Sequence, residues 1–340
     1  MSIVLLVLCS ASATAEDRLH VVSRVSLPAD MQTKLSWGDL RAGCESDGTI
    51  TVGLEPENDD PAASIVKLSP NGAVVARVLV EQVAGFERAV IHDFAPGPNR
   101  ETYVLVSAVK LEELKRDDSG RARSAARLVD LYPTLLRFDA TGQPVAKHRL
   151  ERPIGAPRLA VYASGDALIV RWTRESATRT VAVAGLFTAT GAFLAEIHLP
   201  ESLTGPNQEP HHDRLPLLTP FNGMGDEVLV FKSGNDAVVA GVSNTGEVST
   251  TVLSVPVGFG LFAPRLAGDR LVGSLEVKPT AGSTGLRYAE FDMETGEVIT
   301  THYIKGRGWK LGCSTPNGMS LFNVSTGTLN IVKPTPPSTQ

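Results

Sequence analysis

The chain is poor in cysteine, in aromatic residues and in positive charge, and each shortage narrows what the protein can be. Aromatic residues make up only 6% of the chain. The 3 cysteines are too few for a scaffold that is held together by disulfides. The net charge of −5 argues against a nucleic-acid partner, because phosphate binding needs a basic surface. No apolar run is long enough to cross a bilayer as a helix. We therefore expect neither a nucleic-acid partner nor a membrane span.

Motifs for nucleophilic and phosphate chemistry are also missing. The sequence contains no G-x-S-x-G turn, no glycine-rich phosphate loop and no H-E-x-x-H pair. Its 340 residues are nevertheless 42% apolar, which is enough to bury a sizeable core. The chain reads as a folded protein without a recognisable catalytic constellation.

The N-terminus has the pattern of an export signal. Ile3–Leu8 is continuously apolar, and Ala13-Thr14-Ala15 forms an A-x-A cleavage site before charged residues. We predict a signal peptide over residues 1–15 and a secreted or periplasmic location. Cys9 follows the bulky Leu8, where a lipoprotein signal has a small residue, so lipid anchoring is disfavoured.

A hairpin unit recurs five times along the chain. Each copy has an apolar run, a short polar turn that ends in glycine, and a second apolar run. The turn glycines are Gly72, Gly142, Gly191, Gly246 and Gly296, spaced by about 50 residues apart from one gap of 70. Each copy predicts a β-hairpin whose glycine adopts a positive φ.

Another pair of predicted strands precedes each hairpin, and four antiparallel strands per repeat are typical of a propeller blade. A sixth unit, from Gly308 to Val332, supplies only three strands. Leu19–Leu27 alternates as an edge strand should and can provide the fourth. The prediction is an all-β, six-bladed propeller over residues 16–333, with the last blade completed by the N-terminal strand. Residues 334–340 form a Pro-rich tail that we expect to be disordered.

Two of the turns resemble the strand-turn-strand signature of six-bladed propellers of the NHL and TolB type. They are Phe138-Asp139-Ala140-Thr141-Gly142 and Phe291-Asp292-Met293-Glu294-Thr295-Gly296. The resemblance covers roughly residues 19–333 and implies architecture rather than activity, since such propellers include binding scaffolds, lactonases and lyases. A lactonase would need Ca²⁺ ligands on several inner strands, and only Asp93 and Asn222 stand in plausible places.

Removal of the signal peptide leaves Cys44 and Cys313, an even number in an oxidising compartment. Each follows a glycine and precedes a turn, and closure of the ring makes the first and last blades neighbours. We predict a disulfide between them. The alternative is two separate buried thiols.

The starts of the predicted inner strands carry cations and aromatic residues that would line the mouth of the central channel. The positions are Trp37, Arg88, Arg158, Arg214, Trp309 and Lys310. Such a rim suits a carboxylate-bearing or peptidic ligand. The alternative is that these are ordinary solubilising residues near strand ends.

A metal site is a second hypothesis. His211, His212 and Asp213 lie in the link between the third and fourth blades, and His92 and Asp93 lie on an inner strand. Neighbouring residues on an extended chain point in opposite directions, which argues against His211 and His212 sharing one ion. The acidic stretch 55–61 could hold Ca²⁺ but lacks the spacing of a calcium loop. We expect no cofactor, with Ca²⁺ or Zn²⁺ as the alternatives.

An insertion over residues 110–128 is locally basic in an acidic protein. It predicts a solvated loop, or else a docking element for an anionic partner. Taken together, the sequence favours a monomeric, non-enzymatic binding module that takes a protein, peptide or anionic ligand through its loop-rich face. The alternative is a metal-dependent hydrolase or lyase with its site at the channel mouth.

Overall fold

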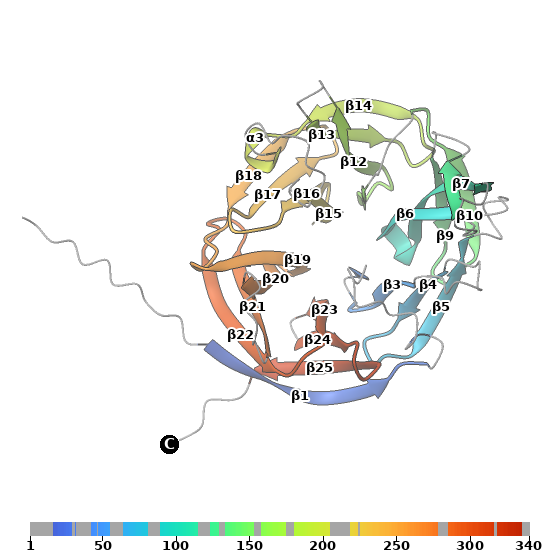
Figure 1. The fold of residues 1–340 in the computed structure, drawn as a ribbon. Helices are drawn as coiled ribbons and strands as arrows, with labels where there is room; N and C mark the ends of the chain where they lie inside the picture. Colours follow the sequence, from blue (N-terminus) through green and yellow to red (C-terminus); the bar gives the residue numbers. More distant parts are fainter. Residues whose placement is uncertain are drawn as a thin grey trace, which may run out of the picture.

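The structure is a computed structural model that describes residues 16–334 except 29–30, 32–41, 46, 55–63, 81–88, 115–122, 129–132, 153–157, 175–179, 205–217, 224, 278–284 and 316–317. The described strands form five sheets arranged around a common centre, like the blades of a propeller (Figure 1). The predicted all-β, propeller-like fold is confirmed. Among the described residues, no helix is both long and apolar enough to cross a membrane.

Four of the sheets each use one continuous stretch of chain, with neighbouring strands antiparallel. The first holds β2 (Ala42–Cys44), β3 (Ile50–Leu54), β4 (Ser64–Leu68) and β5 (Val74–Leu79). The second holds β6 (Ala89–Pro96), β7 (Thr102–Leu114), β9 (Thr134–Phe138) and β10 (Pro144–Arg149), with β8 (Arg123–Leu128) paired to β7. The third holds β11 (Arg158–Val161), β12 (Ala167–Arg174), β13 (Thr180–Phe187) and β14 (Phe193–His198). The fourth holds β15 (Leu218–Asn222), β16 (Glu227–Lys232), β17 (Val238–Ser243) and β18 (Val248–Val252).

The fifth sheet has eight strands in the order β19-β20-β21-β22-β1-β25-β24-β23. From the C-terminal part of the chain come β19 (Phe259–Ala267), β20 (Arg270–Val277), β21 (Gly285–Asp292), β22 (Val298–Lys305), β23 (Trp309–Thr315), β24 (Gly318–Asn323) and β25 (Thr328–Pro334). The remaining strand is β1 (Glu16–Ser26). Two short helical turns, η1 (Pro98–Arg100) and α3 (Glu201–Thr204), complete the described elements.

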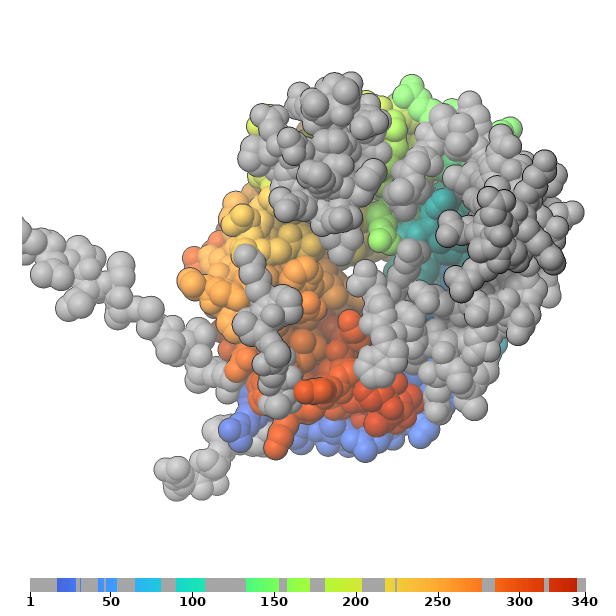
Figure 2. Space-filling model, in the orientation of Figure 1, coloured from blue at the N-terminus to red at the C-terminus, as the bar shows by residue number. Residues whose placement is uncertain are grey.

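The N-terminal strand closes the ring along its outer edge (Figures 1 and 2). β1 pairs antiparallel with β25, from Leu19 opposite Pro334 to Ser26 opposite Thr328, which confirms the predicted pairing. Its first three residues also pair with β22 in parallel, from Glu16 opposite Thr301. This second pairing joins two groups of four strands into one sheet. Hydrogen bonding therefore defines five sheets rather than six separate blades.

The repeated glycine turns are confirmed, since all five glycines have a positive φ between 72° and 90°. Four of the five hairpins also bulge three residues after the glycine, where the extra residue has no partner in the ladder. These extra residues are exposed and apolar: Val75, Val145, Leu194 and Ile299. The hairpin of Gly246 has Ser249 at that position and no bulge. A bulge increases the twist of an outermost strand and makes its free edge a poor template for pairing with another chain.

The same glycines fit one sheet against the next. A side chain at Gly142 would overlap the carbonyl oxygen of Arg77 on β5, and one at Gly296 would overlap that of Val252 on β18. Gly72 faces Val25 of β1, at 2.9 Å from the position of an added Cβ. These three turns therefore require glycine for contact as well as for φ, whereas an added Cβ at Gly246 would lie 3.7 Å from Ile197.

The insertion over residues 110–128, predicted as a solvated loop or a docking element, contains a pair of strands that the sequence analysis did not predict. β7 continues to Leu114, and β8 pairs with it from Val109 opposite Leu128 to Leu114 opposite Arg123. Extending an existing strand pairs each added residue in the ladder, which satisfies its backbone polar groups. The hairpin projects from the second sheet, and residues 115–122 lie outside the described part.

The contact role of the turn glycines can be separated from their φ. Gly142→Ala should lower the free energy of unfolding by more than about 3 kcal/mol, because strain at positive φ adds to overlap with Arg77. Gly268→Ala is the control, since Gly268 has φ 65° with no atom near an added Cβ, and it should cost only about 1–2 kcal/mol. Urea unfolding measures both, and equal losses would contradict the packing role.

Deletion of β1 tests the closure. Removing residues 1–27 takes away Leu19 and Leu27, both buried, and exposes the edge of β25. The free energy of unfolding should fall by more than about 3 kcal/mol. Removing residues 1–15 alone leaves β1 intact and should preserve the melting temperature. If both truncations melt like the full chain, β1 does not hold the ring together.

Candidate functional site

A cavity of about 680 Å³ lies at the centre of the ring. The innermost strands β2, β6, β11, β15, β19 and β23 all contribute to its wall. Its size falls in the range of small-molecule binding sites, and its lining combines aromatic rings and prolines with a few charged groups. This is the candidate site.

A disulfide crosses the wall of the cavity between the first and last of these strands. Cys44 of β2 is bonded to Cys313 of β23, with 5.3 Å between the Cα atoms, which confirms the predicted bridge. The linked residues are 269 apart in sequence, so the bond closes a loop that covers most of the chain. In the chain-entropy description, a loop of this length gives a disulfide a large stabilising effect.

Two polar side chains clamp neighbouring inner strands together. Asp93 Oδ2 accepts a hydrogen bond from the backbone N–H of Leu159 at 2.9 Å. Asn222 Oδ1 accepts one from Val161 N–H at 2.8 Å, and Asn222 Nδ2 donates to the carbonyl of Pro96. Both N–H groups belong to β11, whose inner edge pairs with no strand. These side chains therefore satisfy backbone groups that the ladder leaves unpaired.

Three of the six predicted rim residues line the cavity together. Arg158, Trp309 and Lys310 lie in its wall, whereas Trp37, Arg88 and Arg214 lie outside the described residues. Trp309 Nε1 donates to the carbonyl of Lys305 at 3.2 Å. Arg158 and Lys310 are half-buried, and their side chains form no hydrogen bond or ion pair with the described part of the chain. Two cations of the cavity wall thus have no side-chain partner among the residues that the structure describes.

Arg265 is a third cation of the wall, at a position that no sequence motif predicted. It lies half-buried on β19 beside a bulge, where Ala263 has the unusual φ of 47°. Its Nε donates to the carbonyl of Gly312 at 3.1 Å and its Nη1 to that of Pro264 at 2.7 Å. Burial lowers the pKa of Arg265 to about 10, so the group stays protonated at neutral pH. No sequence signal marks the bulge that places it.

The structure describes only part of the predicted metal set. His92 Nε2 is hydrogen-bonded to Ser107 Oγ at 2.7 Å, and Asp93 forms the clamp to Leu159. His211, His212 and Asp213 lie outside the described residues, as does the acidic stretch 55–61. Within the described ranges, no group of three His, Cys, Asp or Glu side chains is placed to hold a metal ion. The metal site stays a prediction.

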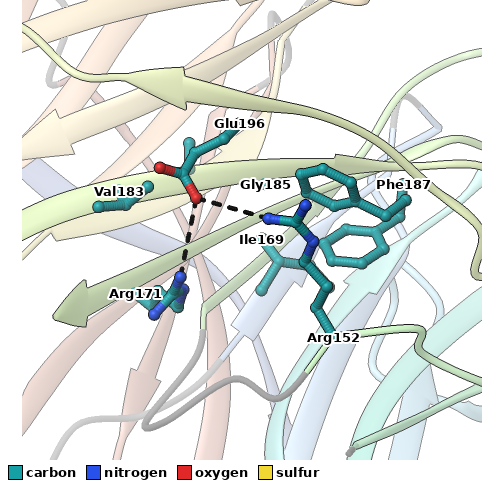
Figure 3. Close-up of a pocket in the computed structure, with 9 residues that line it drawn as sticks. Arg152, Ile169, Arg171, Val183, Gly185, Phe187 and Glu196 are labelled. Carbon is teal, nitrogen blue, oxygen red and sulfur yellow. Dashed lines mark ion pairs between the residues drawn. The ribbon is translucent and has the colours of Figure 1, made fainter.

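A second hollow on the third sheet is too small for a ligand (Figure 3). Its volume of about 10 Å³ is roughly that needed for one water molecule. Arg152 and Arg171 both converge on the carboxylate of Glu196, each at 3.9 Å, and the Arg152 guanidinium lies 3.7 Å from the centre of the Phe193 ring. These groups satisfy one another, and the hollow carries no binding proposal.

No protein-family model matches the chain, and no curated protein does. A solved protein of unknown function from Dyadobacter fermentans is 13% identical over 93% of this chain and 99% of that chain, with a TM-score of 0.51. Another of unknown function from Bacteroides caccae is 12% identical over 81% and 84%, with a TM-score of 0.47. A subtype N10 neuraminidase-like protein of A/little yellow-shouldered bat/Guatemala is 11% identical over 93% and 100%, also at 0.47. At 13% identity, the similarity to the Dyadobacter fermentans protein concerns the fold alone.

The clamp made by Asn222 can be tested apart from any metal role. Asn222→Ala should lower the free energy of unfolding by about 1–3 kcal/mol, because it strands the Val161 N–H and the Pro96 carbonyl. Asn244→Ala is the control, since the Asn244 side chain forms no hydrogen bond with the described residues. Urea unfolding is measured with added CaCl₂ and with EDTA. Stability that rises with calcium in the wild type alone would make Asn222 a metal ligand instead.

Proposed function

We propose that this chain is an exported, six-bladed β-propeller that acts as a non-enzymatic binding protein for an anionic ligand in its central cavity. The six-blade count is supported by the two ends of the eight-stranded sheet, because β19 and β23 both line the cavity. Divided between β22 and β1, that sheet gives two units of four strands, like the others. The NHL or TolB type is supported by the turn resemblance alone.

Export is supported by the N-terminal pattern and by the disulfide. Bonds such as Cys44–Cys313 form and persist mainly in oxidising compartments. A secreted or periplasmic location also suits the signal-like segment over residues 1–15. Both features come from the chain itself, and neither depends on what the cavity holds.

The observation that best supports the binding role is a pair of cations in the cavity wall whose side chains have no partner among the described residues. Arg158 and Lys310 face a concave site together with Arg265, in a chain whose net charge is −5. Charges in such a site are less screened than on an open surface, so an anion entering it gains more than it would from surface lysines. A ligand with a carboxylate or another anionic group suits this wall best.

A binding role is favoured over the metal-dependent hydrolase by how the described polar groups are used. His92 and Asp93 are hydrogen-bonded within the fold, to Ser107 and to the Leu159 N–H. Neither is left free to act on a substrate as the structure stands. Stoichiometric Zn²⁺ or Ca²⁺ that survives dialysis of the purified protein would favour the hydrolase.

The anionic dye 8-anilinonaphthalene-1-sulfonate provides a direct test of the proposed function. Its fluorescence should rise to saturation with one site per chain, and the double variant Arg158→Ala with Lys310→Ala should weaken binding at least about tenfold. The matched control is Arg307→Ala with Lys333→Ala, which removes two exposed cations outside the cavity wall. The control should bind like the wild type. Equal dye binding by all three proteins would overturn the proposal, provided that their melting temperatures agree.

A further inference from the structure

Arg265 is held at the cavity wall with part of its guanidinium unused. Its Nε and Nη1 donate to two backbone carbonyls, those of Gly312 and Pro264. A guanidinium has five N–H donors in a rigid plane, so these two bonds fix its orientation and leave Nη2 without a bond to the described residues. The side chain is thus positioned before any ligand arrives.

Two bulges create this arrangement. On β19, the register shifts between Phe262 and Arg265, and Ala263 takes a positive φ that non-glycine residues rarely adopt. On β23, the register shifts between Leu311 and Cys313, so Gly312 falls outside the ladder and its carbonyl accepts the bond from Arg265. Backbone strain of this kind clusters at binding and catalytic sites, where the surrounding structure holds it in place.

The partner strand is itself firmly anchored. Cys313 follows Gly312 and is bonded to Cys44 on β2, so the acceptor of the Arg265 bond is fixed from the other side. Ser274 Oγ donates to the Phe262 carbonyl at 3.1 Å, beside the start of the β19 bulge. Both strands that position Arg265 are therefore braced, which lowers the cost of ordering the site when a ligand binds.

No described carboxylate neutralises Arg265. Glu276 also lines the cavity, but it is exposed and forms no ion pair with Arg265. A partly desolvated guanidinium bound only to carbonyls keeps an uncompensated charge, which an anion from solution can pair. The planar fork matches the two oxygens of a carboxylate better than it matches a single halide.

The surroundings of Arg265 are apolar. Phe262, Leu266, Phe221 and Trp309 line the same cavity, together with Pro264. A small number of polar groups in a largely apolar wall is the usual composition of a site for an organic molecule. The wall therefore suits a ligand with one anionic end and an apolar body.

We propose that Arg265 binds the carboxylate of a ligand whose aromatic or aliphatic body packs against the apolar wall of the central cavity. This inference rests on the proposed binding function and adds the chemical class of the ligand and the residue that selects it. The shared chemistry is a carboxylate next to an apolar group. It can come from a free organic acid or from the C-terminal residue of a peptide.

Isothermal titration of four probes tests the proposal. 3-Phenylpropionate is compared with its neutral amide, and the peptide N-acetyl-Gly-Phe with a free C-terminus is compared with its C-terminal amide. In each pair the acid should bind the wild type at least about tenfold more tightly than the amide. Tighter binding of the peptide acid than of 3-phenylpropionate identifies a C-terminus as the source, and the reverse identifies a small acid.

Variants assign the selectivity to Arg265. Arg265→Met should bind acid and amide with the same weak affinity, and Arg265→Lys should keep part of the preference because its charge remains. Arg171→Met is the control, as Arg171 is a half-buried arginine outside the cavity, and it should bind like the wild type. If Arg265→Met does not fold, the proposal is tested by two remaining comparisons: acid against amide in the wild type, and the acid preference of Arg265→Lys against that of the wild type.

The outcomes separate this inference from the proposed function. Dye binding that depends on Arg158 and Lys310, with no preference for acid over amide, would overturn the role of Arg265 and leave an anion-binding cavity. An unchanged acid preference in Arg265→Met would place the carboxylate on another cation and also overturn it. Failure of the dye and of both acids to bind would overturn the two proposals together.

Discussion

The structure depends on satisfying the free edges of the strands that meet at its centre. Among the described strands, each innermost one has an edge that no other strand covers, and its N–H and C=O groups are costly to bury unless another group bonds to them. Side chains meet this need. Asp93 and Asn222 satisfy β11, and Arg265 satisfies β23. The same constraint decides which polar side chains can bind a ligand. A side chain that already bonds to backbone groups has fewer donors or acceptors left, or none.

At the outer rim, the exposed strand edges could pair with strands of other chains. Bulges at Val75, Val145 and Leu194 distort the outermost strands of three sheets, and one at Ile299 distorts β22 beside its short pairing with β1. β1 covers the outer edge of β25 and ties it to β22. Closure at the rim by β1 and at the centre by the Cys44–Cys313 bond act on the same junction, where the two ends of the chain meet.

The features that the sequence predicted well were those set by local chemistry or by ring closure. Glycine at a fixed place in a polar turn indicates a hairpin, whatever its surroundings. The alternating segment Leu19–Leu27 could be assigned to the last repeat because that repeat lacked a fourth strand. Cys44 and Cys313 could be paired because a closed ring makes the first and last repeats neighbours. Each inference needed only a turn rule or the topology.

The features that escaped prediction depend on contacts between distant segments. The β19 bulge has no signature in Phe262–Arg265, so Arg265 did not stand out from other arginines. The parallel pairing of Glu16–Arg18 with β22 could not be expected from an edge strand that already had a partner. Asp93 and Asn222 looked like metal ligands because their residue types fit, whereas their use as clamps depends on the neighbouring strand.

The most direct test of the account is a crystal structure of the protein with 3-phenylpropionate. We expect the carboxylate within hydrogen-bond distance of Arg265 Nη2, with the phenyl ring against the apolar wall of the central cavity and the bonds to Gly312 and Pro264 retained. A carboxylate bound elsewhere, with Arg265 contacting only those two carbonyls, would contradict it.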